Sequence, residues 1–317
     1  MTTTASVNGT RYHRTASRAE KRADGFLHRR IDVGEVTLHV AEARPSFVSG
    51  DEVPKDVPLV VLLHGFPEFW WSWRDQLRAL ADAGCWAVAP DMRGYNESDK
   101  PEGVAAYELE KLAGDVSGLI KALGRDKAYV VGHDWGAVVA WFFAQEHQDQ
   151  LERLAILNVP HPLEMMKGLR RPKQLKKSWY MFFFQLPRLP ELMLARKDFL
   201  FARKTFSADG FDRETIEHYV DALRVPGAAT SAINYYRAAI RRVALGRVPR
   251  TKPIERPVLV IWGDKDRYLG QEMADPPKRF VPNARVVHIP SATHWVQNDA
   301  PEEVNRLLID LTRPSAR

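Results

Sequence analysis

The sequence predicts an α/β fold in which helices cover both faces of a mostly parallel central sheet. Short apolar runs alternate with amphipathic stretches in a strand–helix rhythm. The runs are apolar throughout, as in strands that are buried on both faces. This rhythm stops near residue 161 and resumes near residue 251, which indicates a helical insert within one core domain.

The first part of the core is predicted over residues 26–160. A polar segment at residues 1–25 precedes it, and we expect a flexible lead-in rather than a signal peptide. Apolar runs predict strands at residues 27–31, 36–40, 59–63, 86–89, 128–131 and 154–157. Amphipathic stretches predict helices at residues 71–83, 107–123 and 137–147.

The insert is predicted over residues 161–250, where the sequence is basic, aromatic and helical. Several prolines punctuate it, and it contains no convincing buried strand. The second part of the core then covers residues 251–317. It predicts strands at 258–262 and 285–289 and helices at 271–280 and 301–311.

Charge is concentrated in the insert, which has 18 Lys and Arg against 8 Asp and Glu, while the whole chain carries +6. The basic segment at 167–177 suggests nucleic acid or an anionic membrane surface, but a solvated helix face is the simpler interpretation. No nucleic-acid motif accompanies it, so we expect no nucleic-acid partner.

Two further features bound the location of the chain. No apolar run is long enough to cross a bilayer, so no transmembrane segment is expected. The single cysteine, Cys85, begins the apolar run at residues 85–89 and is interpreted as a buried strand residue, which fits a reducing cytoplasm. The sequence leaves a homodimer open.

Asp134 lies where a predicted strand turns into a helix, in the run Gly132-His133-Asp134-Trp135-Gly136. Small neighbours allow the central residue of such a turn to stand clear as a nucleophile at the carboxyl edge of the sheet. An aspartate at this point could instead cap the helix, and the turn alone does not decide between the two roles. His133 has no further ligands at metal spacing, so we expect no metal site.

Two later segments favour the nucleophile. Asp264 and Asp266 follow the strand at 258–262, and His294 follows the strand at 285–289. Nucleophile, acid and histidine in this order, each after a separate strand, are typical of hydrolytic triads at a carboxyl sheet edge. The loop after the strand at 59–63 suits an oxyanion hole, in which the Phe66 and Trp135 backbone N–H groups converge.

The chain resembles the epoxide hydrolases of the α/β-hydrolase fold over about residues 26–312. The resemblance is carried by the elbow at 132–136, the His294 segment, the loop at 64–67 and the segment at 91–101. It implies that Asp134 attacks carbon and forms an alkyl ester, which water activated by His294 then hydrolyses. Asp266, three residues after Gly263, is the implied acid that orients His294. No cofactor is implied.

An epoxide, unlike a halide, leaves as an alkoxide that needs a proton. The conjugate acid of an alkoxide has a pKa near about 15.7, and an ordinary tyrosine near about 10 could donate to it with roughly 8 kcal/mol of driving force. Tyr180 lies in a segment that resembles the first cap-tyrosine motif of the family, and Tyr236 resembles the second. The family tyrosine directly precedes an arginine, which favours Tyr236 over Tyr235. Both could instead be core aromatic residues.

Two alternatives remain. A haloalkane or haloacetate dehalogenase could use the same triad, but haloacetate enzymes carry arginines where this chain has Trp135 and Val138. Haloalkane enzymes often have asparagine where this chain has Phe66. A non-catalytic ligand-binding protein on this fold typically lacks a triad member. The expected partners are therefore water and a small hydrophobic epoxide, in a pocket formed by His64, Pro67, Trp70, Met181, Phe182 and Trp295.

Overall fold

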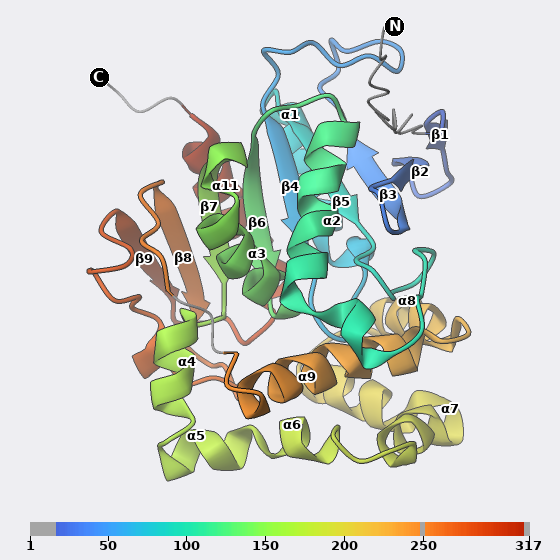
Figure 1. Ribbon diagram of the computed structural model, residues 1–317. Coiled ribbons are helices and arrows are strands. Elements are labelled where there is room, and N and C mark those ends of the chain that lie inside the picture. The colour runs from blue at the N-terminus through green and yellow to red at the C-terminus, as the bar shows by residue number, and fades with distance from the viewer. Residues whose placement is uncertain (1–16, 248–250, 314–317) are drawn as a thin grey trace, which may run out of the picture.

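The computed structural model describes residues 17–247 and 251–313, which form a nine-stranded sheet with helices on both sides (Figure 1). Residues 1–16 of the predicted flexible segment lie outside the described residues. Within residues 17–25 of that segment, β1 (Glu20–Lys21) pairs antiparallel with β2. The predicted fold class is confirmed.

The sheet has the order β1-β2-β3-β5-β4-β6-β7-β8-β9 and is parallel from β5 to β9. Its antiparallel edge is formed by β1, β2 (Leu27–Asp32) and β3 (Thr37–Ala43). The parallel strands are β4 (Leu59–Leu63), β5 (Trp86–Pro90), β6 (Ala128–His133), β7 (Leu151–Leu157), β8 (Val258–Gly263) and β9 (Ala284–Ile289). Every residue of β4, β5 and β8 is buried, which explains their unbroken apolar sequence.

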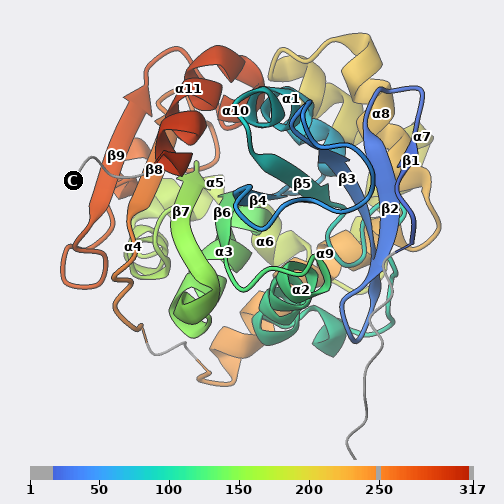
Figure 2. The same cartoon turned by 90° about the horizontal axis from the view of Figure 1, so that it is seen from above.

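Helices cover the two faces of the sheet in separate groups (Figure 2). One face carries η1 (Trp70–Trp73), α1 (Arg74–Asp82), α10 (Val296–Asp299) and α11 (Pro301–Thr312). The other carries α2 (Leu109–Ala122) and α3 (Trp135–Glu146). Two more short 3₁₀ turns, η2 (Val104–Tyr107) and η3 (Gln148–Gln150), join these elements.

The predicted helix at residues 271–280 is wrong. Only a 3₁₀ turn forms there, η4 (Gln271–Met273). Pro276 and Pro277 follow it, and proline removes a helix donor and disfavours helical backbone at the preceding residue.

Between β7 and β8 the residues that the structure describes form six helices, which lie across the carboxyl edge of the parallel strands (Figure 1). They are α4 (Pro162–Gly168), α5 (Pro172–Lys177), α6 (Trp179–Phe183), α7 (Leu189–Ala208), α8 (Arg213–Arg224) and α9 (Ala228–Ala244). Non-helical backbone at residues 196–199 breaks α7 into two parts. We call α4–α9 the helical insert. Across residues 17–247 and 251–313, no helix is long and apolar enough to cross a membrane.

Candidate active site

Asp134 lies at the turn from β6 to α3, with φ 46° and ψ −120°. Such a positive φ is uncommon for a non-glycine residue and is typical of strained functional turns. A Cβ on Gly132 would lie 2.5 Å from the Gly136 carbonyl oxygen, and one on Gly136 would lie 2.1 Å from the Leu63 carbonyl oxygen. Only glycine fits at these two positions, so the two glycines allow the turn to close tightly under Asp134.

The carboxylate of Asp134 does not cap α3, although the residue occupies the N-cap position. One of its oxygens, Oδ1, accepts a hydrogen bond from the Phe66 backbone N–H at 2.8 Å. Its other oxygen, Oδ2, lies 3.5 Å from His294 Nε2. The two oxygens therefore have different surroundings. Oδ1 is held by a backbone donor, whereas Oδ2 faces the imidazole of His294.

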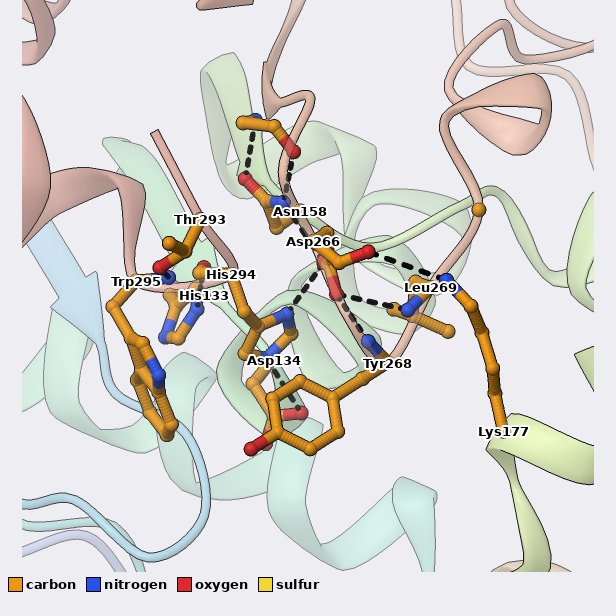
Figure 3. Close-up of polar contacts among 12 residues, drawn as sticks. His133, Asp134, Asn158, Lys177, Asp266, Tyr268, Leu269, Thr293, His294 and Trp295 are labelled. Atoms are coloured by element: carbon orange, nitrogen blue, oxygen red, sulfur yellow. Dashed lines mark hydrogen bonds and ion pairs between the residues drawn. The ribbon is translucent and has the colours of Figure 1, made fainter. Parts of the chain in front are cut away.

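His294 lies between two carboxylates (Figure 3). Its Nδ1 donates to Asp266 Oδ2 at 2.7 Å, while Nε2 faces Asp134. Asp264, the other candidate acid, instead lies 2.6 Å from His288 Nδ1. The structure thus brings Asp134, His294 and Asp266 together at the ends of three strands, as their order in the sequence predicts.

Asp266 is held by four hydrogen bonds. Its Oδ1 accepts from the backbone N–H groups of Tyr268 (2.7 Å) and Leu269 (2.9 Å). Its Oδ2 accepts from His294 and from the Asn158 side-chain amide, at 2.9 Å for the amide. Both oxygens are occupied by donors, which fixes the carboxylate in the orientation that faces the imidazole.

Burial and charge act in opposite directions on these groups. Burial alone would raise the pKa of Asp134, but the hydrogen bond and positive charge of His294 hold it below its ordinary value. Burial would also raise the pKa of Asp266, and His294 and the backbone donors lower it. Burial would lower the pKa of His294, yet the charge of Asp266 and the contact with Asp134 raise it well above its ordinary value. The two carboxylates therefore favour the protonated form of His294, and His294 favours their ionised forms.

The predicted oxyanion loop lies directly against Asp134. A Cβ on Gly65 would lie 2.4 Å from the Asp134 Cβ, so only glycine fits here. Phe66 contributes its N–H to Asp134. Trp135 is the first residue of α3, and its ring lies edge-on to Tyr236 with centroids 4.9 Å apart.

A buried polar network lies beneath this loop. Glu68 Oε2 accepts from the Gly65 N–H (3.1 Å) and lies 2.8 Å from His133 Nδ1. The other ring nitrogen of His133 donates to the His294 carbonyl at 2.9 Å. Gln297 donates to Glu68 Oε1 at 3.1 Å. The network joins the oxyanion loop, the elbow and the histidine loop.

Tyr180 on α6 and Tyr236 on α9 come from the insert, and their rings meet edge-to-face with centroids 5.9 Å apart. Both line the same cavity as Asp134 and His294. Burial, followed by the charge of Asp134, raises the pKa of each tyrosine above its ordinary value. Tyr235 points elsewhere, because its hydroxyl donates to the Arg93 carbonyl at 2.7 Å.

The cavity has a volume of about 720 Å³ and lies between the core and the insert. Of the predicted pocket residues, Pro67 and Trp295 line it, together with Phe66. The lining also includes residues that the sequence did not indicate, among them Phe184, Leu194, Phe206 and Tyr268.

Four predicted pocket residues do not line the cavity. His64 is fully buried and accepts from the Met92 N–H, and Trp70 packs against Phe26 and His28. The prediction that Met181 and Phe182 line the cavity is wrong because of helix geometry. Side chains four residues apart share a helix face, so Tyr180 and Phe184 face the cavity, whereas Phe182 is 54% exposed.

Asp209, between α7 and α8, connects the insert to the core loops. Its Oδ2 accepts from the Tyr268 hydroxyl (3.0 Å) and the Trp295 indole N–H (3.1 Å), and its Oδ1 pairs with Arg267. Sequence reasoning missed Asp209, which belongs to no motif. It also missed Asn158, although Asn158 follows β7 at the carboxyl edge of the sheet and could have been found there. Within the described residues, no group of three His, Cys, Asp or Glu side chains could hold a metal ion.

The chain is similar to known proteins over most of its length. A family model described as alpha/beta hydrolase fold matches residues 58–301. The AB hydrolase superfamily protein YfhM of Bacillus subtilis is 40% identical over 90% of this chain and 98% of its own length. Epoxide hydrolase 4 of Mus musculus is 37% identical over 79% of this chain and 72% of its own. A Bacillus megaterium epoxide hydrolase, solved with an inhibitor, is 31% identical, with a TM-score of 0.79 over 90% of this chain and all of that one.

Proposed function

Because this chain belongs to the epoxide hydrolases of the α/β-hydrolase fold, we propose that it converts a hydrophobic epoxide to a vicinal diol through an ester on Asp134. The observation that carries this proposal is the arrangement around Asp134. One carboxylate oxygen is held by a backbone donor, the other faces His294, and two tyrosines lie across the same cavity. The insert acts as a cap that supplies those tyrosines.

In the first step, Asp134 Oδ2 attacks an epoxide carbon and the carbon–oxygen bond of the ring breaks. Oδ1 stays a carbonyl oxygen because the Phe66 N–H holds it. The oxygen released from the ring takes a proton from Tyr180 or Tyr236. The products of this step are an alkyl ester on Asp134 and a tyrosinate.

Because the pKa values of Tyr180 and Tyr236 are raised, the driving force for proton donation in the free enzyme is smaller than the value expected for an ordinary tyrosine. Both tyrosines are weaker acids than a free tyrosine, because they are buried and face the negative charge of Asp134. That charge leaves Asp134 as the ester forms and develops on the epoxide oxygen. The same step that creates the alkoxide therefore removes one cause of the weak acidity, and a tyrosine becomes a better donor when it is needed.

In the second step, His294 takes a proton from water, and the hydroxide attacks Cγ of Asp134. The negative charge then rests on Oδ1, where the Phe66 N–H and the Trp135 N–H stabilise it. Collapse of this intermediate breaks the bond between Cγ and Oδ2. The departing Oδ2 takes the proton of the hydroxyl that was added to Cγ, which leaves Asp134 as a carboxylate. The proton that His294 took from water passes to the tyrosinate formed in the first step, so the diol leaves and the enzyme is restored.

His294 must be neutral to accept that proton. In the free enzyme its pKa is raised, because Asp266 and Asp134 both stabilise the imidazolium. Esterification neutralises Asp134 and removes one of these two charges, so the pKa of His294 falls once the ester exists. The ester thus prepares the base that hydrolyses it.

Oxygen labelling under single turnover tests the covalent route. The enzyme in excess is mixed with an epoxide in ¹⁸O-water, and the diol is analysed by mass spectrometry. The diol oxygen added in the first turnover should be unlabelled, because it comes from Asp134, and the label should appear in the enzyme. A first-turnover diol that carries solvent oxygen would show direct attack by water and refute the ester. Release of halide from haloalkanes or haloacetates, without diol formation from epoxides, would instead favour a dehalogenase.

A further inference from the structure

The outer surface of the insert is unusually apolar. Among the described residues, nine of the thirteen exposed large hydrophobic side chains lie between residues 175 and 201. They include Trp179 (56% exposed), Phe182 (54%), Leu189 (45%), Leu192 (68%) and Met193 (49%). Figure 1 shows α5, α6 and the start of α7 along the edge of the molecule farthest from the sheet. We call this surface, from Leu175 to Phe201, the outer face.

The outer face is also strongly basic. Residues 170–201, which are the outer face and the five residues before it, contain eight Lys and Arg and two acidic residues, Glu191 and Asp198. Asp198 is paired with Arg203 and Arg224. Glu191 is already neutralised, because Arg237 binds both of its oxygens, at 2.6 and 3.1 Å. Arg170, Arg188 and Arg196 are exposed. Exposed apolar and aromatic side chains among uncompensated cations are the combination found on surfaces that lie in a membrane interface.

The cavity extends to residues of this face. Its lining includes the exposed Lys176, Trp179 and Phe201, which belong to the outer face, and the exposed Lys173 beside it. The same cavity reaches Asp134 and His294 at its inner end. An apolar molecule in a bilayer against this face would therefore lie next to residues that line the cavity.

We propose that the outer face docks the protein on an anionic lipid bilayer. A second copy of the chain is a poorer occupant, because a symmetric contact would bring two basic surfaces together. Nucleic acid would match the charge but would leave the leucines, Met193 and Phe182 without apolar partners. Anionic headgroups over acyl chains match both the cations and the apolar side chains.

Co-sedimentation with vesicles tests docking directly and requires no turnover, so it can fail independently of the proposed reaction. The protein should bind vesicles of equal parts phosphatidylglycerol and phosphatidylcholine. It should bind vesicles of phosphatidylcholine alone at least about tenfold more weakly. Added salt should weaken binding to the anionic vesicles, because it screens exposed charges.

Two variants outside the cavity lining separate the apolar and charged contributions. The first combines Leu186→Ser, Leu192→Ser and Met193→Ser, and the second combines Arg170→Gln, Arg188→Gln and Arg196→Gln. Each should reduce the affinity for anionic vesicles at least about tenfold, with an unchanged melting temperature. The matched control is Phe47→Ser, since Phe47 is 67% exposed and lies between β3 and β4, away from the insert. This control should bind like the unaltered protein.

Three results would overturn the proposal. One is the absence of binding to anionic vesicles. A second is binding that both triple variants retain in full. The third is a dimer or a nucleic-acid complex that forms without lipid and is lost in the triple variants, since either would assign the outer face to a different partner.

Discussion

The two halves of the candidate site are held in different ways. The core half, Asp134, His294 and Asp266, is fixed by hydrogen bonds between buried charged groups and backbone donors. The insert half, Tyr180 and Tyr236, is held by contacts between rings, with Phe184 edge-on to both at centroid distances of 6.0 and 4.9 Å. Hydrogen bonds depend on direction, so they hold individual atoms of the core half in place. Contacts between rings determine only which ring surfaces of the insert half meet.

This difference matches the chemistry that we assign to each half. Attack on carbon and on Cγ requires a defined trajectory, which a tightly bonded carboxylate and imidazole provide. Protonation of a released oxygen tolerates a range of positions, and two tyrosines can share it. We therefore expect single changes in the core half to have larger effects than single changes in the insert half.

The largest effect should follow from His294→Gln. The ester should still form, because Asp134 remains a carboxylate, but its hydrolysis should slow by at least about 10⁴-fold. Intact-protein mass spectrometry after mixing with an epoxide should then show the protein with the mass of the epoxide added. The control is His288→Gln, since His288 contacts Asp264 outside the triad. An unmodified His294→Gln protein that still makes diol would contradict the assigned base.

The double change Tyr180→Phe and Tyr236→Phe should lower the rate of ester formation by about 10³-fold, because the alkoxide loses both acids. Each single change should cost only about tenfold, since one tyrosine remains. Stopped-flow measurement of ester formation separates this step from hydrolysis. Tyr235→Phe is the matched control, because its hydroxyl donates to Arg93 away from the cavity. Equal losses in the control and in the double variant would place the proton donor elsewhere.

Acidification should slow the second step more than the first. The pKa of Asp134 is held below its ordinary value, so the nucleophile stays ionised between pH 8 and 5. His294 must be neutral in the ester state, and each pH unit below its pKa there should lower ester hydrolysis about tenfold. Quenched-flow experiments should therefore show ester accumulating at low pH. If the rates of ester formation and ester hydrolysis fell in parallel with pH, a single titrating group would control both steps.

Asp209→Ala should have the smallest effect, because it acts on the connection between the two halves. It leaves the Tyr268 hydroxyl and the Trp295 indole without their acceptor, which should lower the free energy of unfolding by about 1–3 kcal/mol. A shift of the insert should reduce kcat/KM about tenfold. Asp209→Asn keeps an acceptor, so it should lose less of the free energy of unfolding and less of kcat/KM. Denaturant titration measures the first quantity and steady-state kinetics the second. Identical behaviour of the two variants would show that Asp209 does not join the halves.

Sequence predicted the core half well because its residues follow separate strands, and parallel strands end at one edge of the sheet. The strands that precede Asp134, Asp266 and His294 therefore place all three residues at the same edge of the sheet. Glu68 and Gln297 could not be found in this way. They meet through a hydrogen bond between residues far apart in the chain, and neither lies in a motif.

The insert was predicted as helical, but the orientation of its helices was not. Met181 and Phe182 were assigned to the pocket because they are apolar neighbours of Tyr180. Which side of a short helix faces the cavity depends on its packing, and here the inward positions are Tyr180 and Phe184. Composition identifies an aromatic helix, whereas its rotation is a tertiary property.

The pairing of β7 with β8 has a consequence for how such a chain can change in evolution. Leu154 to Leu157 pair with Val258 to Ile261 in an unbroken parallel register, although all of residues 158–257 lie between the two strands. The insert thus follows the carboxyl end of β7, and the chain then returns to the amino end of the neighbouring strand β8. Helices can be exchanged, lengthened or reshaped there without altering the sheet register that carries the triad. Substrate range can therefore diverge in the insert while the reaction is inherited intact from the core.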